Sequence, residues 1–84
     1  MNTESSIVIF KMHKRRKTVD IEVPNNISAN DLVIALNSAY DLGIDTSDIK
    51  NCYLKSENPV ALLHGNKTLE EYGIRNGSVI NFTE

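Results

Sequence analysis

The chain has 84 residues, a formal net charge of −2, one cysteine and no tryptophan. This length fits one domain over residues 1–84, and a content of 40% hydrophobic and 24% charged residues indicates a globular protein rather than a disordered one. Apolar runs such as Ile7 to Phe10 are far shorter than the roughly 20 residues of a membrane helix. Residues 2–6 are polar, unlike a signal peptide, so we expect a flexible segment over 1–6 and a cytoplasmic protein without direct membrane insertion.

The charge is unevenly distributed along the chain. Five of the nine basic residues lie between positions 11 and 17 with no acidic residue among them: Lys11, Lys14, Arg15, Arg16 and Lys17. The other four basic residues stand against all eleven acidic ones, so the rest of the chain carries a net charge of −7. The basic segment is therefore a candidate for recognition of a partner.

One strand is predicted before the basic segment and one after it. The β-branched and aromatic segment 7–12 predicts a strand, and the solvent preference of Lys11 points its even-numbered residues inward: Val8, Phe10 and Met12. Apolar residues alternate with Asp20 and Glu22 over 19–23, which predicts a second strand with one wet face, ending at Pro24. Segment 13–17 then forms a hairpin connection wider than two residues.

A helix follows the second strand. Ser28 and Asp31 have the spacing of a capping box, flanked by apolar residues in the positions of a hydrophobic staple. Gly43 is placed to end the helix in the left-handed conformation. The expected apolar stripe recurs at three- and four-residue spacing: Leu32, Ala35, Leu36, Ala39 and Tyr40.

The second half of the chain predicts shorter elements. Residues 45–48 form a polar connection, 51–55 a third strand and 60–63 a fourth, with a turn at Asn58-Pro59 between them. Residues 68–73 have the pattern of one helical turn with a capping box, and 78–82 that of a last strand. This order predicts an α+β fold of the β-grasp type: a mixed four- to five-stranded sheet, its terminal strands parallel at the centre, with one main helix on one face.

Three segments, in this order, resemble ubiquitin: Lys17–Val23, Gly43-Ile44 and Lys67–Ile74. Within the ubiquitin-like proteins, residues 69–78 resemble the C-terminal signature of the YukD/EsaB-type proteins of bacterial type VII (WXG100) secretion systems. Members often carry an acid where this chain has Ser78. The resemblance implies a non-enzymatic adaptor that docks onto a protein component of a membrane-bound secretion complex, either free in the cytoplasm or held at the inner face of the membrane through that partner. The alternative is a generic ubiquitin-like scaffold unrelated to secretion.

Conjugation and catalysis are not expected. Ubiquitin and its sulfur-carrier relatives act through a C-terminal diglycine, whereas this sequence ends Asn81-Phe82-Thr83-Glu84. Cys52 in the middle of a strand is typical of an inert, partly buried thiol, and His13 of a solvated loop histidine. Glu70 and Glu71 suit the first turn of a helix better than a catalytic pair. We therefore predict no catalytic residue, no cofactor and no metal site.

The candidate partner-binding residues of the basic segment are Lys14, Arg15, Arg16 and Lys17. They form either a solvated hairpin tip that discourages aggregation or a docking patch for an acidic protein, an anionic membrane surface or nucleic acid. The −7 on the rest of the chain repels an extended polyanion, so a protein partner is favoured and no nucleic acid is expected. We expect serine at positions 15 and 16 to leave folding intact and to weaken partner binding.

The second candidate surface is the sheet face turned away from the helix. Tyr53 is the expected anchor there, near Asn81 and Thr83 on the last strand. Alternatively, Tyr53 is an aromatic residue merely half-buried on the sheet. The sequence predicts a monomer or a weak dimer, because exposed edge strands permit pairing.

Overall fold

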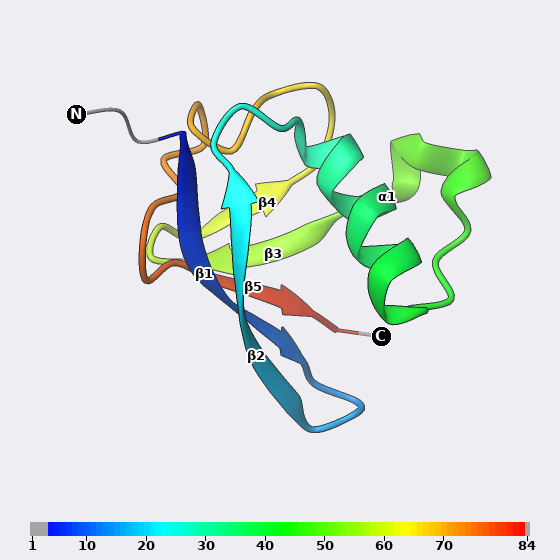
Figure 1. Cartoon of the computed structure of the whole chain (residues 1–84). Helices are drawn as coiled ribbons and strands as arrows, with labels where there is room; N and C mark the ends of the chain where they lie inside the picture. Colours follow the sequence, from blue (N-terminus) through cyan, green and yellow to red (C-terminus); the bar gives the residue numbers. More distant parts are fainter. Residues whose placement is uncertain (1–3, 84) are drawn as a thin grey trace.

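A computed structural model describes residues 4–83 of the chain. It contains two long strands that form a hairpin, one α-helix, one 3₁₀ helix and three short strands (Figure 1). In chain order these are β1 (Ser5–Met12), β2 (Lys17–Pro24), α1 (Ala29–Tyr40), η1 (Thr46–Asn51), β3 (Leu54–Glu57), β4 (Ala61–Leu63) and β5 (Val79–Phe82).

The five strands form one mixed sheet in the order β2-β1-β5-β3-β4. β1 and β5 pair in parallel at its centre, from Ile9 opposite Val79 to Met12 opposite Phe82, and the remaining pairs are antiparallel. The helix α1 lies across one face of this sheet (Figure 1). The predicted α+β, β-grasp architecture is confirmed, including the parallel pairing of the terminal strands.

The expectation of a flexible segment covered residues 1–6. Residues 1–3 lie outside the described part of the chain, whereas Ser5 and Ser6 are the first two residues of β1. The buried Ser6 hydroxyl donates to Asn25 Oδ1 at 2.6 Å, and the backbone N–H of Asn25 donates to the carbonyl of Glu4 at 2.8 Å. These bonds join the start of β1 to the end of β2.

The core lies between α1 and the sheet. As predicted, β1 points Val8, Phe10 and Met12 inward, and all three are fully buried or nearly so. The buried stripe of α1 differs from the prediction, because Val33 is buried whereas Ala35 and Ala39 are exposed. The helix is thus rotated about its axis relative to the predicted stripe. Its core-facing residues are Ala29, Leu32, Val33 and Leu36.

The start of α1 is as predicted, but its end is not. Ser28 is the N-cap, and its side chain accepts from the backbone N–H of Asp31 at 3.1 Å. The predicted end at Gly43 is wrong: Asp41 adopts the left-handed conformation (φ 53°), and the helix ends at Tyr40. Aspartate is one of the few residues other than glycine that tolerates this conformation.

The connection between β1 and β2 together with the first residue of β2, residues 13–17, is called the basic loop below, and it contacts the end of α1. The Arg15 guanidinium donates to the carbonyl oxygens of Tyr40 at 2.6 Å and Asp41 at 2.5 Å. The last carbonyls of a helix lack intrahelical partners and carry the negative end of its dipole, so a cation stabilises them. Arg15 therefore ties the β1–β2 hairpin to the helix, so its replacement is expected to lower stability even where the protein still folds.

The predicted third strand begins too early. Residues 46–51 form the 3₁₀ helix η1, and β3 starts only at Leu54. Asp45 caps η1 by accepting from both the hydroxyl (2.6 Å) and the backbone N–H (3.1 Å) of Ser47, and these bonds lower the pKa of this carboxyl. These local bonds favour a helical turn over an extended strand. Cys52 and Tyr53 consequently precede β3 and do not lie in the middle of a strand.

The predicted capping box at Thr68 is confirmed, within a hydrogen-bonded turn over 68–73. The backbone N–H of Thr68 donates to the Glu71 carboxylate at 2.9 Å, and the backbone N–H of Glu71 donates to the Thr68 hydroxyl at 3.2 Å. The Thr68 hydroxyl also donates to the carboxylate, at 3.1 Å. The backbone bond, followed by the hydroxyl bond, lowers the pKa of Glu71 below its ordinary value.

The substitution Arg15→Ser is expected to destabilise the fold by about 1 kcal/mol, because it removes two charge-assisted bonds to helix carbonyls. This corresponds to a fall of roughly 4–8 °C in thermal midpoint for a domain of this size. The exposed neighbour Lys14 provides the matched control, and Lys14→Ser should change stability by less than about 0.5 kcal/mol. Equal midpoints for the two variants would contradict the structural role of Arg15.

The substitution Glu71→Ala is expected to destabilise the protein in a pH-dependent way. A carboxyl with a lowered pKa in the folded state stabilises it above the unfolded pKa of about 4.3, and this contribution is lost as the pH falls. In thermal melts from pH 7 to pH 3, the thermal midpoint of wild type should therefore exceed that of Glu71→Ala at neutral pH. The difference between the two midpoints should shrink as the pH falls. Glu70→Ala, which removes the exposed neighbouring carboxyl and leaves the bonds between Thr68 and Glu71 in place, is the control and should destabilise the protein less than Glu71→Ala at pH 7.

Candidate protein-docking site

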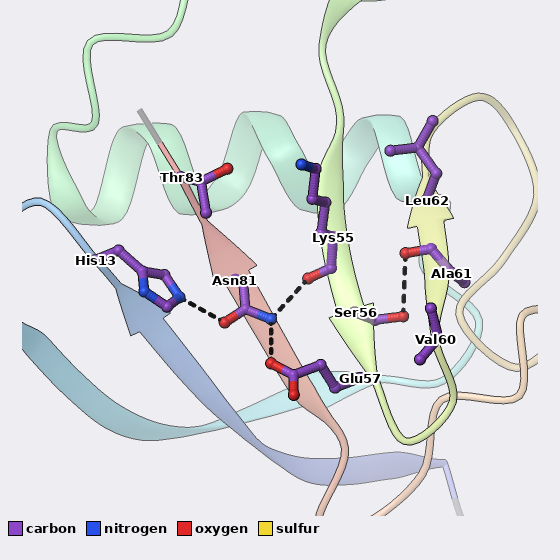
Figure 2. Close-up of a pocket in the computed structure, with 9 residues that line it drawn as sticks. All are labelled: His13, Lys55, Ser56, Glu57, Val60, Ala61, Leu62, Asn81 and Thr83. Carbon is purple, nitrogen blue, oxygen red and sulfur yellow. Dashed lines mark hydrogen bonds between the residues drawn. The ribbon is translucent and has the colours of Figure 1, made fainter.

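The sheet face opposite α1 is not covered by any described helix. Figure 2 looks onto this face, with α1 behind the sheet. Successive side chains of a strand point to opposite faces of the sheet, so the residues that do not point into the core point outward on this face. Across the centre of the face, β5 presents Asn81, which lies opposite Lys11 of β1 and Lys55 of β3, and Lys55 in turn lies opposite Leu62 of β4.

Asn81 organises the centre of this face. It is 6% exposed, and its side-chain oxygen accepts from His13 Nε2 at 2.6 Å. Its amide nitrogen donates to the Glu57 carboxylate at 2.9 Å and to the Lys55 carbonyl at 3.4 Å (Figure 2). The network joins the start of the basic loop to β5 and β3. Asn81 is thus buried beneath its partners and shapes the surface without itself being free for contact.

An open depression of about 540 Å³ lies beside this network. Val60 is 87% exposed and Leu62 47% exposed, so two large apolar side chains line its β4 side. Lys55, Glu57 and His13 provide the polar border (Figure 2). An apolar patch with a polar border is typical of a protein-docking surface.

The turn that carries Val60 is held firmly in place. The Ser56 hydroxyl donates to the Pro59 carbonyl at 2.7 Å. The fully buried Ser78 donates to the Asn58 carbonyl at 2.7 Å, and Arg75 donates to the Asn58 side chain at 2.9 Å. Ser78 thus fixes the β3–β4 turn from the position just before β5. Such support lowers the entropy lost when the patch binds.

Sequence reasoning missed Val60 and Leu62, although the signal was present. The run of four apolar residues, 60–63, was interpreted as a strand without a choice of faces. Successive residues of a strand face opposite sides of the sheet, so a buried Leu63 directs Leu62 outward.

The structure divides the predicted basic patch. All four of its residues are exposed, with Lys14, Arg15 and Arg16 in the turn and Lys17 at the start of β2. Arg15 is held by the end of α1, as described above. A partner-binding role of these four residues remains a prediction.

Tyr53 lies beside the sheet face opposite α1, called the outer face below, rather than at its centre. It is 49% exposed and lines a separate depression with Asp45 and Asp48. Thr83 lines both depressions, so the two surfaces adjoin at this end of the sheet. Its role as an anchor also remains a prediction.

The chemistry of the described residues gives no support for catalysis. Cys52 is buried, and burial together with the carboxylates of Asp48 and Asp45 raises the pKa of its thiol, which disfavours the reactive thiolate. His13 is exposed but is hydrogen-bonded to Asn81 and so is not simply solvated. Residues 4–83 contain no group of three or more potential metal ligands. None of the helices in this range has the length and apolar character needed to cross a bilayer.

Comparison with solved structures identifies the fold. The chain is similar to the C-terminal ubiquitin-like domain of mouse tubulin-specific chaperone e, with 14% identity, a TM-score of 0.71, and coverage of 100% of this chain and 93% of that one. It is also similar to a ubiquitin-like domain from tubulin-binding cofactor B, with 20% identity, a TM-score of 0.74, and coverage of 95% and 89%. At these identities the likeness shows the fold alone.

Sequence comparison identifies the family. No curated protein matches the chain. Residues 7–81 match the family model described as "WXG100 protein secretion system (Wss), protein YukD". This match covers most of the chain, from β1 to β5, and confirms the resemblance seen in residues 69–78. The chain therefore belongs to the YukD family of the WXG100 protein secretion system.

Proposed function

We propose that this protein is a non-enzymatic adaptor of a bacterial type VII secretion system that docks onto a protein component of the membrane complex through the outer sheet face. The observation that carries the proposal is the exposed pair Val60 and Leu62, beside the Asn81 network, in a chain of the YukD family. We place the protein in the cytoplasm, free or held at the membrane by its partner, as a monomer or a weak dimer.

The composition of the face indicates the kind of partner. Full burial of a valine or leucine side chain contributes roughly 1.5–3 kcal/mol, so an apolar side chain seated between Val60 and Leu62 would supply most of the binding energy. Lys55, Glu57 and His13 at the border would then set orientation and specificity through polar contacts.

Docking rather than covalent attachment is the proposed mode of action. Conjugation of ubiquitin-like proteins requires adjacent glycines that thread through an enzyme channel. The four glycines of this sequence stand apart from one another, and each occupies a position of positive φ in the fold: Gly43, Gly65, Gly73 and Gly77.

The docking proposal predicts the result of affinity capture from detergent-solubilised membranes of the producing cells. Immobilised wild-type protein should retain components of the secretion complex, identified by mass spectrometry. Val60→Ser combined with Leu62→Ser should reduce this capture about tenfold or more, because it removes the apolar anchors.

Ile34→Ser is the matched control, since Ile34 is 44% exposed on α1, on the other side of the sheet. It should capture as much as wild type, and thermal melts should show that all variants are folded. Retention of no secretion component by the wild type would refute the adaptor role. Equal capture by the double variant would refute the outer face as its docking surface.

A further inference from the structure

The free edge of β2 exposes backbone hydrogen-bonding groups. β2 is the first strand of the sheet, with β1 on one side and no described strand on the other (Figure 1). The N–H of Ile9 bonds to Ser78 and that of His13 to Phe82, so the odd-numbered residues of β1 direct their backbone groups to β5. The even-numbered residues therefore bond to β2, at their register partners Lys17, Val19, Ile21 and Val23.

The other residues of β2 consequently turn their N–H and C=O groups outward. These are Thr18, Asp20 and Glu22, which together present three donors and three acceptors along about 13 Å of extended strand. Such a row is a template on which another extended segment can pair.

An apolar groove runs beside this edge, between β2 and α1. Its volume is about 240 Å³. Ile21 of β2, Leu36 of α1 and Ile27 of the connection between them contribute its apolar lining. Exposed small residues on the helix, Ala35 and Ala39, keep it open. The groove exists because α1 buries Val33 in place of Ala35 and Ala39.

The charge at one end of the groove is positive. Tyr40 lines the groove, and its carbonyl accepts from Arg15, so this end meets the basic loop. By strand alternation, Lys17 shares the helix side of β2 with Val19, Ile21 and Val23. An acidic group that leaves the groove at this end would therefore meet Lys17 and the remaining charges of the loop.

We infer that the β2 edge and this groove form a second docking site, for an extended peptide segment of a partner protein. The segment adds a strand to β2, places alternate apolar side chains in the groove and ends in acidic residues at the basic loop. A second copy of this chain fits less well, because antiparallel pairing of two β2 edges sets Asp20 and Glu22 of one copy against those of the other. The site is separate from the outer sheet face and does not depend on the secretion role.

The test uses two fluorescein-labelled synthetic peptides, each with a valine, an isoleucine and a valine alternating with threonines. One carries three aspartates after this stretch and the other carries them before it, which covers both strand directions. At least one should bind the full chain in fluorescence anisotropy, and a version with lysines in place of aspartates should bind about tenfold more weakly. In NMR spectra the backbone amides of Thr18, Asp20 and Glu22 should shift and gain protection from hydrogen exchange.

Three variants localise the site. Lys17→Glu and Ala35→Glu should each weaken the peptide about tenfold, whereas Ile34→Glu, on the helix but outside the groove lining, should not. The double serine variant at Val60 and Leu62 should bind the peptide like wild type, which separates this site from the outer face. Failure of both peptides to bind, shifts confined to the outer face, or β2 amide shifts that follow the concentration of the protein alone would each overturn the proposal.

Discussion

A single helix can cover only one face of a five-stranded sheet, and the rest of this structure follows from that constraint. The 12 residues of α1 span about 18 Å, enough to bury the core side of the central strands. The opposite face must remain exposed, and no other described helix covers it. A sheet face exposed in this way has to be polar enough to keep the protein in solution. The side chains of its central strand are nevertheless buried by neighbours on both sides.

Asn81 meets these two demands at once. At the centre of the sheet it is almost completely buried, so its amide needs partners as surely as a core polar group does. It finds them in His13 on one side and Glu57 on the other. The result is a polar, internally bonded centre, beside which Val60 and Leu62 form an exposed apolar patch at the β4 edge.

The fold was predictable from the sequence wherever one local pattern decided the outcome, and was mispredicted where a side-chain contact, near or distant in the chain, competed with that pattern. Alternation identified the inward face of β1, and the Ser28 spacing identified the start of α1. The end of α1 was misplaced because Asp41 and not a glycine takes the left-handed conformation there, where Arg15, far away in the chain, bonds to the carbonyls of Tyr40 and Asp41. The start of β3 was misplaced because side-chain bonds at Asp45 favour a 3₁₀ helix over the extended conformation that the apolar pattern indicated.

The candidate surfaces were harder to predict, since each depends on elements brought together by the fold. Nothing local to Asn81 indicates that it is buried, because its partners lie 68 and 24 residues away. The groove beside β2 depends on the rotation of α1, which turns small residues outward along one side.

The basic loop illustrates how one compositional feature can serve two purposes. Its charges were interpreted as a single patch, but Arg15 is committed to the end of α1, whereas Lys17 lies on the groove side of β2. The strand order sets β2 and β4 at opposite edges of the sheet, so the groove and the Val60–Leu62 depression face different directions. Two partners seated on these surfaces would not compete for the same residues. A domain of 84 residues therefore has room for two separate docking surfaces.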